Sequence, residues 1–146
     1  MSTIFVIRPV RNITPDFQES VDNQIEEFKE LGYTVYDPQV DTDQDDVNGY
    51  RICMDNLGAI QHADYVCFMW DGKSQGCLFD LGMAFALDKP MLCIPKLMPP
   101  MTEGKSFQNM AYAWSLFSEE EEQRIEEQNR HDWQREQSWY ELSREE

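Results

Sequence analysis

Short apolar runs alternate along the chain with longer segments whose apolar residues recur at helical spacing. The runs cover residues 4–7, 33–36, 65–70 and 91–94. Helical spacing is found over about 15–31, 49–62 and 75–87. Strands that alternate with helices of this length form parallel sheets through right-handed crossovers. The pattern therefore predicts an α/β fold, a Rossmann-like (flavodoxin-like) three-layer arrangement around a parallel sheet of four or five strands.

The composition changes at Ser118, where a polar and strongly acidic segment begins. Residues 118–146 contain eleven acidic and four basic residues. Ser118 precedes a run of glutamates, a pattern typical of a helix start because carboxylates favour the positive end of the helix dipole. Ile125, Trp133 and Tyr140 form a thin apolar stripe that could pack against the domain or against a second subunit. We expect an α/β domain over 1–117 and an acidic C-terminal helical tail over 118–146.

The net charge of −16 argues against a nucleic-acid ligand, because most of the surface repels a polyanion. It permits a small anion, which needs only a local positive site. No apolar stretch approaches the roughly 20 residues of a membrane span, and the N-terminus does not resemble a signal peptide. We therefore expect no membrane or nucleic-acid partner.

The four cysteines contain no CxxC pair, and we expect free thiols in a reducing compartment, the cytoplasm. The acidic segment 41–49 superficially resembles a calcium loop. However, Asp46 stands where the tight turn needs glycine, and Ile52 where the bidentate glutamate belongs. We expect a solvated loop there, with no metal and no cofactor.

Ligands of open parallel sheets bind beyond the carboxyl ends of the strands. Residues that follow the first three strands are therefore candidate ligand contacts: Arg8, Pro9, Arg11, Asp37, Trp70, Asp71 and Ser74. Ser74 to Gly76 leads directly into a helix, whose free N–H groups and dipole could hold an anion together with Arg8 and Arg11. Alternatively, Ser74 is an ordinary helix cap and the arginines are surface charges. Spacing alone leaves both interpretations open.

Asp80 is expected about a turn and a half inside that helix, between the apolar residues Phe79 and Leu81. A carboxylate in such a position is costly unless it is solvated, paired or used chemically. It is therefore a candidate nucleophile, with a salt-bridged structural aspartate as the alternative.

The segment from Ser74 to Ala84 (SQGCLFDLGMA), with Lys89-Pro90 beyond it, resembles the signature helix of the nucleoside 2-deoxyribosyltransferase superfamily. The segment 56–64 also matches, and the resemblance extends in element order over about residues 3–112. Ser74 lies six residues before the carboxylate, as in the 2′-deoxynucleoside 5′-phosphate N-hydrolases, where this serine helps to hold the 5′-phosphate. The resemblance thus implies a nucleoside or nucleotide as ligand, with the serine favouring a monophosphate.

The resemblance implies a retaining displacement at the anomeric carbon of the sugar. In the family a glutamate attacks, an aspartate protonates the leaving base and a tyrosine on the first strand orients the nucleophile. These roles fall on Asp80, Asn56 and Phe5, and all three differ from the family pattern. Asp80 is shorter, Asn56 cannot act as an acid, and Phe5 lacks the hydroxyl. Asp55 could replace Asn56 only if the helix turned.

Three functions remain open on this basis. The first is cleavage or transfer of an N-glycosidic bond through Asp80, and the second is a catalytically impaired nucleotide-binding protein. The third is a scaffold for the acidic tail. Family members are homodimers or larger, with a neighbouring subunit often completing the site. Ser106 and Asn109 are candidates for that contribution, with helix capping and packing as the alternative.

Overall fold

Four parallel strands in the order β2-β1-β3-β4 form the sheet of the computed structural model, which describes residues 1–144. The strands are β1 (Thr3–Ile7), β2 (Thr34–Tyr36), β3 (Tyr65–Phe68) and β4 (Met91–Cys93). The helices are α1 (Pro15–Glu30), α2 (Pro38–Asp41), α3 (Tyr50–His62), α4 (Gln75–Ala86), η1 (Pro95–Leu97) and α5 (Phe107–Arg144). The predicted parallel α/β sheet is confirmed with four strands, whereas α2 and η1 were not predicted.

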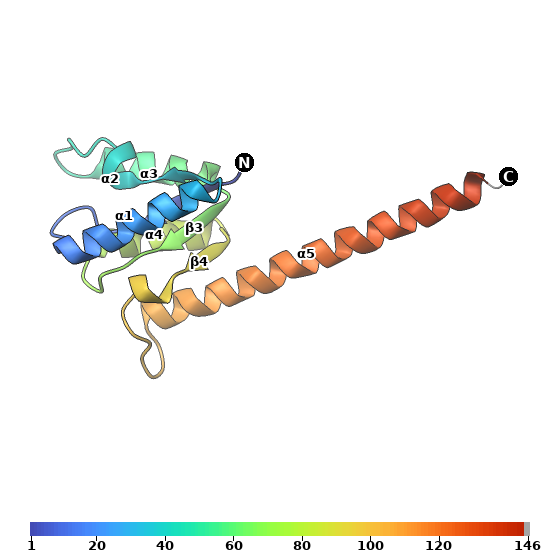
Figure 1. Cartoon of the computed structure of the whole chain (residues 1–146). Coiled ribbons are helices and arrows are strands. Elements are labelled where there is room, and N and C mark those ends of the chain that lie inside the picture. The colour runs from blue at the N-terminus through green and yellow to red at the C-terminus, as the bar shows by residue number, and fades with distance from the viewer. Residues whose placement is uncertain (145–146) are drawn as a thin grey trace.

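Helices cover both faces of the sheet, which gives the predicted three layers (Figure 1). Side chains alternate along each strand, so Phe5 and Ile7 on β1 pack in the cluster with α3 and α4 residues. Ile4 and Val6 face the other way and pack with α1. All four side chains are fully buried, as expected for a central parallel strand.

Side-chain caps start the two helices that follow β1 and β3. The Thr14 hydroxyl accepts the Phe17 N–H at 3.3 Å before α1, and the Ser74 hydroxyl accepts the Cys77 N–H at 3.4 Å before α4. Each bond satisfies one of the N–H groups that have no partner within the first turn of a helix. Both helix starts agree with the sequence prediction.

The sequence predicts that the C-terminal helix starts at Ser118, and this is wrong. The helix starts eleven residues earlier, at Phe107. The true cap is Ser106, whose hydroxyl accepts the Asn109 N–H at 3.0 Å. Ser118 lies in the middle of α5, and its hydroxyl accepts the Met91 N–H at 3.0 Å. Because β4 is an edge strand, its outward N–H needs such a partner. Ser118 thus fastens α5 to the open edge of the sheet.

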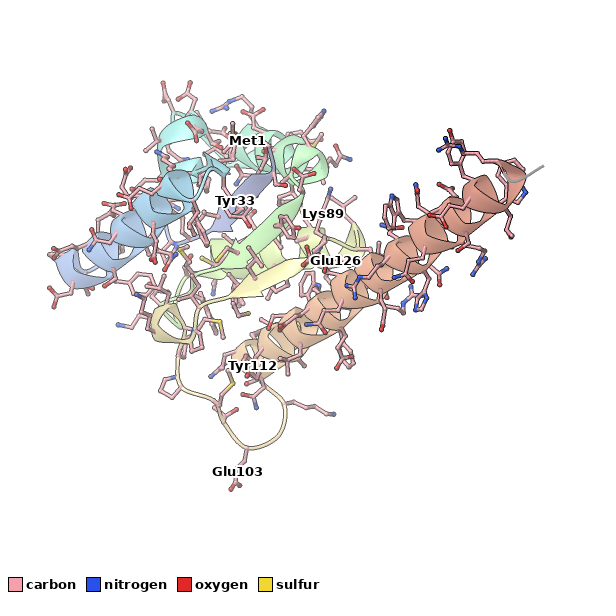
Figure 2. All side chains as sticks on the ribbon, turned by 45° about the vertical axis from the view of Figure 1, so that its right-hand side comes forward. Met1, Tyr33, Lys89, Glu103, Tyr112 and Glu126 are labelled. Atoms are coloured by element: carbon pink, nitrogen blue, oxygen red, sulfur yellow. The ribbon has the colours of Figure 1, made fainter. Side chains whose placement is uncertain are left out.

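The second half of α5 projects from the domain as a straight rod (Figure 1). Glu126 marks the place where the helix passes the edge of the domain (Figure 2). Beyond it, Trp133 and Tyr140 remain 61% and 54% exposed, so this part of the predicted apolar stripe does not pack against the domain. We call residues 127–144 the arm. Among the helices of residues 1–144, none combines the length and apolar composition needed to cross a bilayer.

Candidate functional site

A pocket of about 710 Å³ lies beyond the carboxyl ends of β1 and β3. The connection after β1 leads to α1 on one face of the sheet, and the connection after β3 leads to α4 on the other. Connections that leave in opposite directions open a crevice at the end of a parallel sheet. The predicted site residues that line this pocket are Arg8, Arg11, Asn56, Asp71, Ser74, Gly76 and Asp80.

Arg8 follows β1 directly, and its side chain is fully buried beside the pocket. Its Nη1 lies 3.3 Å from the Asp22 carboxylate and 3.4 Å from that of Asp37, while Nε donates to the Pro9 carbonyl oxygen. Nη2 has no hydrogen-bond partner within residues 1–144. Burial raises the pKa of Asp37, and the positive charge of Arg8 opposes that rise. Arg8 is therefore no surface charge, and Asp37 serves as its partner.

The pocket carries a balanced set of charges on an otherwise acidic protein. Its three cationic side chains are Arg8, Arg11 and Lys73, and its three carboxylates are Asp46, Asp71 and Asp80. The chain as a whole has a net charge of −16. This local balance makes the pocket less repulsive to an anion than an average part of the surface.

The start of α4 forms another wall of the pocket. One carboxylate oxygen of Asp71 accepts the N–H groups of Lys73 and Ser74, each at 2.9 Å, and so shapes the turn into the helix. Ser74 caps α4, as the alternative interpretation held. Capping does not remove its ability to bind a ligand, because the hydroxyl can still donate its proton. Gly76 in the first helical turn lines the pocket as well.

Asp80 lies at the base of the pocket, with only 7% of its surface exposed. Burial raises the pKa of its carboxyl to about 6, and a hydrogen bond from Asn56 opposes the rise. That bond is long, with 3.4 Å between Asn56 Nδ2 and Asp80 Oδ2. No Lys or Arg within residues 1–144 forms an ion pair with Asp80, so the salt-bridged alternative does not hold. A buried carboxylate without a cation is a candidate chemical group.

Several residues singled out from the sequence lie outside the pocket. Phe5 is buried in the core and stacks on Tyr36 with 5.4 Å between ring centroids. Trp70 is also buried, and its Nε1 donates to the Ser74 carbonyl oxygen at 3.0 Å. Asp55 is exposed on α3 and pairs with Arg51. The helix therefore presents Asn56, and not Asp55, to Asp80.

Ser106 and Asn109 also lie away from the pocket, at the start of α5. The Asn109 side chain bonds to the backbone of Thr102 and Gly104, which braces the loop before the helix. Pro9 is buried, and its carbonyl oxygen accepts the hydrogen bond from Arg8 Nε. Within one chain, these three residues have structural contacts.

One wall of the pocket, the segment 44–49, was not predicted from the sequence. The Asp46 carboxylate accepts the Ile52 N–H at 3.1 Å, which anchors the segment to the start of α3. Phe79 on α4 is another unpredicted lining residue, 56% exposed. The order of elements could have predicted this wall. The segment follows β2 and therefore lies near the edge of the sheet where the parallel strands end.

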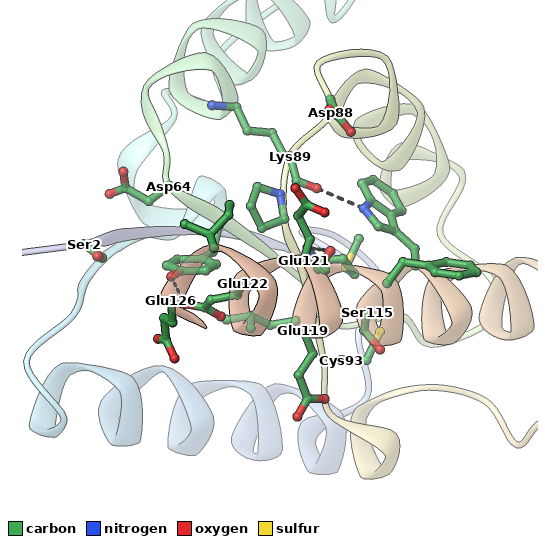
Figure 3. Close-up of a pocket in the computed structure, with 18 residues that line it drawn as sticks. Ser2, Asp64, Asp88, Lys89, Cys93, Ser115, Glu119, Glu121, Glu122 and Glu126 are labelled. Carbon is green, nitrogen blue, oxygen red and sulfur yellow. Dashed lines mark hydrogen bonds between the residues drawn. The ribbon is translucent and has the colours of Figure 1, made fainter. Parts of the chain in front are cut away.

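A larger hollow of about 1050 Å³ lies along α5, near the first residues of β3 and β4 (Figure 3). Several of its polar groups bond to the elements around the hollow. The Lys89 ammonium donates to the carbonyl oxygens of Gln61 and Ala63 at the end of α3, and Tyr65 donates to Glu122 at 2.9 Å. The hollow is at the opposite end of the strands from Asp80. We therefore assign the candidate active site to the smaller pocket.

The family model described as nucleoside 2-deoxyribosyltransferase matches residues 12–136. A 2-deoxyribosyltransferase from Bacillus psychrosaccharolyticus is similar in structure, with a TM-score of 0.56 and 17% identity over 75% of this chain and 90% of that one. A CMP N-glycosidase from Clostridium botulinum has a TM-score of 0.51 and 16% identity, over 77% and 82%. No curated protein matches the sequence. At these identities the two structures show a shared fold.

The raised pKa of Asp80 predicts how stability depends on pH. The folded state holds the Asp80 proton more tightly than the unfolded state, where an aspartate titrates near 3.9. The stabilisation is therefore complete below about pH 4 and is lost as the pH rises through about 6. Across this range the loss amounts to about 3 kcal/mol, at 1.36 kcal/mol for each pH unit.

Urea unfolding of the wild type and of Asp80→Asn between pH 4 and 8 measures this loss. We expect the stability of Asp80→Asn relative to the wild type to increase by about 3 kcal/mol from pH 4 to 7 and then to level off. The difference cancels the titration of Asp37, which both proteins share. A difference that stays constant over this range would contradict the assignment.

Proposed function

The chain belongs to the nucleoside 2-deoxyribosyltransferase family, and we propose that it cleaves or transfers the N-glycosidic bond of a nucleoside or nucleoside 5′-monophosphate with Asp80 as nucleophile. The observation that carries this proposal is the buried Asp80 carboxylate, which lies in the pocket without a cationic partner. With a pKa of about 6, it is mostly ionised at pH 7 and more basic than an ordinary aspartate. Both properties favour attack on an anomeric carbon.

The reaction has two displacements at C1′ of the sugar. In the first, an Asp80 oxygen forms a bond to C1′ while the bond between C1′ and the base nitrogen breaks and the base leaves with the electron pair. In the second, water or another base attacks C1′ and releases a proton to solvent while the ester bond to Asp80 breaks, which restores the carboxylate. Asn56 cannot supply a proton to the leaving base, so that proton comes from solvent. Two inversions retain the configuration at C1′.

The other end of the pocket supports a 5′-phosphate. The first turn of α4 offers N–H groups that have no acceptor within the helix, and the helix dipole favours an anion there. The Ser74 hydroxyl and Gly76 line this part, and Arg8 and Arg11 contribute positive charge. We therefore favour a monophosphate over an unphosphorylated nucleoside.

A nucleotide-binding protein without turnover is the second candidate function. The observation that favours it is Asn56, which occupies the place of a general acid but holds no transferable proton. Loss of general-acid catalysis typically costs 10²–10⁴-fold in rate. Binding at the start of α4 does not depend on this residue.

The chain also has features that support self-association through α5. Ser118, Ile125, Trp133 and Tyr140 recur at intervals of seven or eight residues and thus share one side of the helix. Ser118 faces β4, whereas Trp133 and Tyr140 on the arm have no part of the domain beside them (Figure 1). Exposed aromatic residues on one side of a helix are typical of an interface. We propose that a second copy covers the arm in a homodimer or larger assembly.

The state of the cysteines supports a reducing compartment such as the cytoplasm. Cys53, Cys67, Cys77 and Cys93 are all free. Burial raises the pKa of the Cys67 thiol and raises that of Cys93 to about 11, so both stay protonated and unreactive. We propose the cytoplasm as the location.

Release of free base tests the enzymatic proposal. Incubation with a panel of nucleosides and nucleoside 5′-monophosphates, followed by chromatography, should show base release by the wild type. Asp80→Ala should lower the rate by at least about a thousandfold, because a nucleophile is lost, and should still bind the ligand in a thermal-shift assay. Asp16→Ala on α1, an exposed aspartate outside the pocket, is the matched control and should keep wild-type activity.

Different outcomes separate the candidate functions. Base release that survives in Asp80→Ala contradicts the assigned nucleophile. Stabilisation by a ligand, about 2.7 kcal/mol at 100 times its dissociation constant, without any base release favours the nucleotide-binding protein. If neither base release nor stabilisation by a ligand is observed, a scaffold for the acidic helix is the function that remains. If the positions are an altered active site, Asn56→Asp combined with Asp80→Glu should raise the rate, since the acid and the longer carboxylate are both restored.

Ser74→Asp tests the phosphate position. An aspartate also caps a helix well, so the fold should persist, but its charge would lie beside a bound phosphate. We expect the affinity for a monophosphate to fall by about tenfold or more and the affinity for the matching nucleoside to stay unchanged. Ser74→Asn, a neutral cap of similar size, is the control. Equal losses for both ligands would place the phosphate elsewhere.

Sedimentation equilibrium tests the role of the arm. The variant with Trp133→Ser and Tyr140→Ser should sediment as a single chain where the wild type sediments as two or more, because the apolar contact is lost. The control carries Gln128→Ser and His131→Ser, two exposed positions that lie on the opposite side of the helix from Trp133 and Tyr140. Equal masses for the wild type and the aromatic variant would rule out this interface.

A further inference from the structure

A chain of three side-chain hydrogen bonds leads from β2 to the Asp80 carboxylate. The Tyr36 hydroxyl lies 2.7 Å from Thr42 Oγ1. The Thr42 hydroxyl donates to Asn56 Oδ1 at 2.8 Å, and Asn56 Nδ2 donates to Asp80 Oδ2 at 3.4 Å. These residues come from β2, the end of α2, α3 and α4, so the chain crosses four elements.

The direction of the donors follows from the number of protons each group holds. A hydroxyl has one proton to donate, and Thr42 gives its proton to Asn56. Tyr36 is therefore the donor in its bond to Thr42 at 2.7 Å, which is shorter than its other contact, 3.4 Å to the Asp41 carbonyl oxygen. With its oxygen held by Thr42, the Asn56 amide can point only its N–H groups toward Asp80. Each link thus donates toward the carboxylate at the end of the chain.

We propose that Thr42 and Tyr36 are positioning residues of the active site, which hold the Asn56 amide with its N–H groups toward the Asp80 carboxylate. They act through Asn56 and do not touch the reacting atoms. The proposal rests on the proposed function only where Asp80 is called the nucleophile. The hydrogen-bond chain itself is a property of the folded protein, with or without a substrate.

Burial makes the orientation of the amide matter. Thr42 and Asn56 are 3% and 6% exposed, so water does not readily replace a lost partner. If the Thr42 hydroxyl is removed, Asn56 Oδ1 loses its donor. It regains one when the amide turns and Asp80 carries a proton to donate. Loss of Thr42 therefore favours the protonated form of Asp80, which is not a nucleophile.

Other titratable groups around Asp80 belong to the same pocket and stay in place in the Thr42 variants. Burial raises the pKa of the Cys53 thiol on α3 and of the Cys77 thiol on α4, and the nearby Asp80 charge adds to the rise of each. The remaining charged groups of the pocket are Arg8, Arg11, Asp46, Asp71 and Lys73. None of these side chains bonds to Thr42 or Tyr36 within residues 1–144. A change in the titration of Asp80 can thus be traced to the chain.

The test is a carbon-13 NMR titration of the aspartate carboxyl groups, which needs no substrate. The Asp80 signal is identified by its loss in Asp80→Asn. We expect Thr42→Val to increase the proton affinity of Asp80 about tenfold, and Thr42→Ser to restore the wild-type value because it returns the hydroxyl. Thr34→Val on β2 removes an exposed hydroxyl that bonds to Met1 Sδ and takes no part in the chain of bonds, and it is the matched control.

Tyr36→Phe keeps the ring that stacks on Phe5 and removes only the first donor, so it tests the chain even if Thr42→Val fails to fold. Its effect should have the same direction and be smaller, since Thr42 still donates to Asn56. Unchanged proton affinity of Asp80 in both Thr42→Val and Tyr36→Phe would overturn the proposal. Where turnover is measurable, the acid limb of the rate profile should move to higher pH with the same variants. An absence of turnover would count against the proposed function alone, because the titration reports on Asp80 directly.

Discussion

The position of β1 between two parallel partners is the constraint on which the site depends. Phe5 on β1 is in register with Tyr36 on β2 and with Val66 on β3, so the three strands end at one edge of the sheet. The helices after β1 and β3 then lie on opposite faces and cannot close over that edge. The pocket is the space that remains, and both Arg8 and the start of α4 are placed at it by the strands they follow.

This arrangement of strand ends buries the guanidinium group of Arg8 beside the pocket. A buried guanidinium is stable only with partners, and Arg8 obtains them from α1 through Asp22 and from the end of β2 through Asp37. The contacts join three elements beneath the pocket. Because Nη2 has no partner, both of its N–H groups are unused donors within the described chain. Arg8 thus joins the strand ends through Nη1 and keeps Nη2 available as a donor. This explains how an acidic protein could hold an anion in the pocket.

The order of elements could be predicted because strands and helices differ in the period of their apolar residues. The start of α5 could not, since Ser118 followed by glutamates has the pattern of a cap, and its bond to Met91 spans distant residues. Residues near strand ends were good candidates for the pocket, but Trp70 and Pro9 are turned into the core. The roles of Tyr36 and Thr42 depend on contacts among four elements, which no local spacing reveals.

The stacked pair of Phe5 and Tyr36 connects the departures from the family pattern. The resemblance places an orienting tyrosine at position 5, where this chain has a phenylalanine that stacks on the ring of Tyr36. The hydroxyl is thus present one strand away, and it reaches Asp80 through Thr42 and Asn56. That route requires an amide at position 56, because an ionised carboxylate there has no proton to donate to Asp80. Phe5 and Asn56 are therefore compatible changes. Together they replace the acid that the resemblance implies for the leaving base with a fixed hydrogen-bond donor to Asp80, the proposed nucleophile.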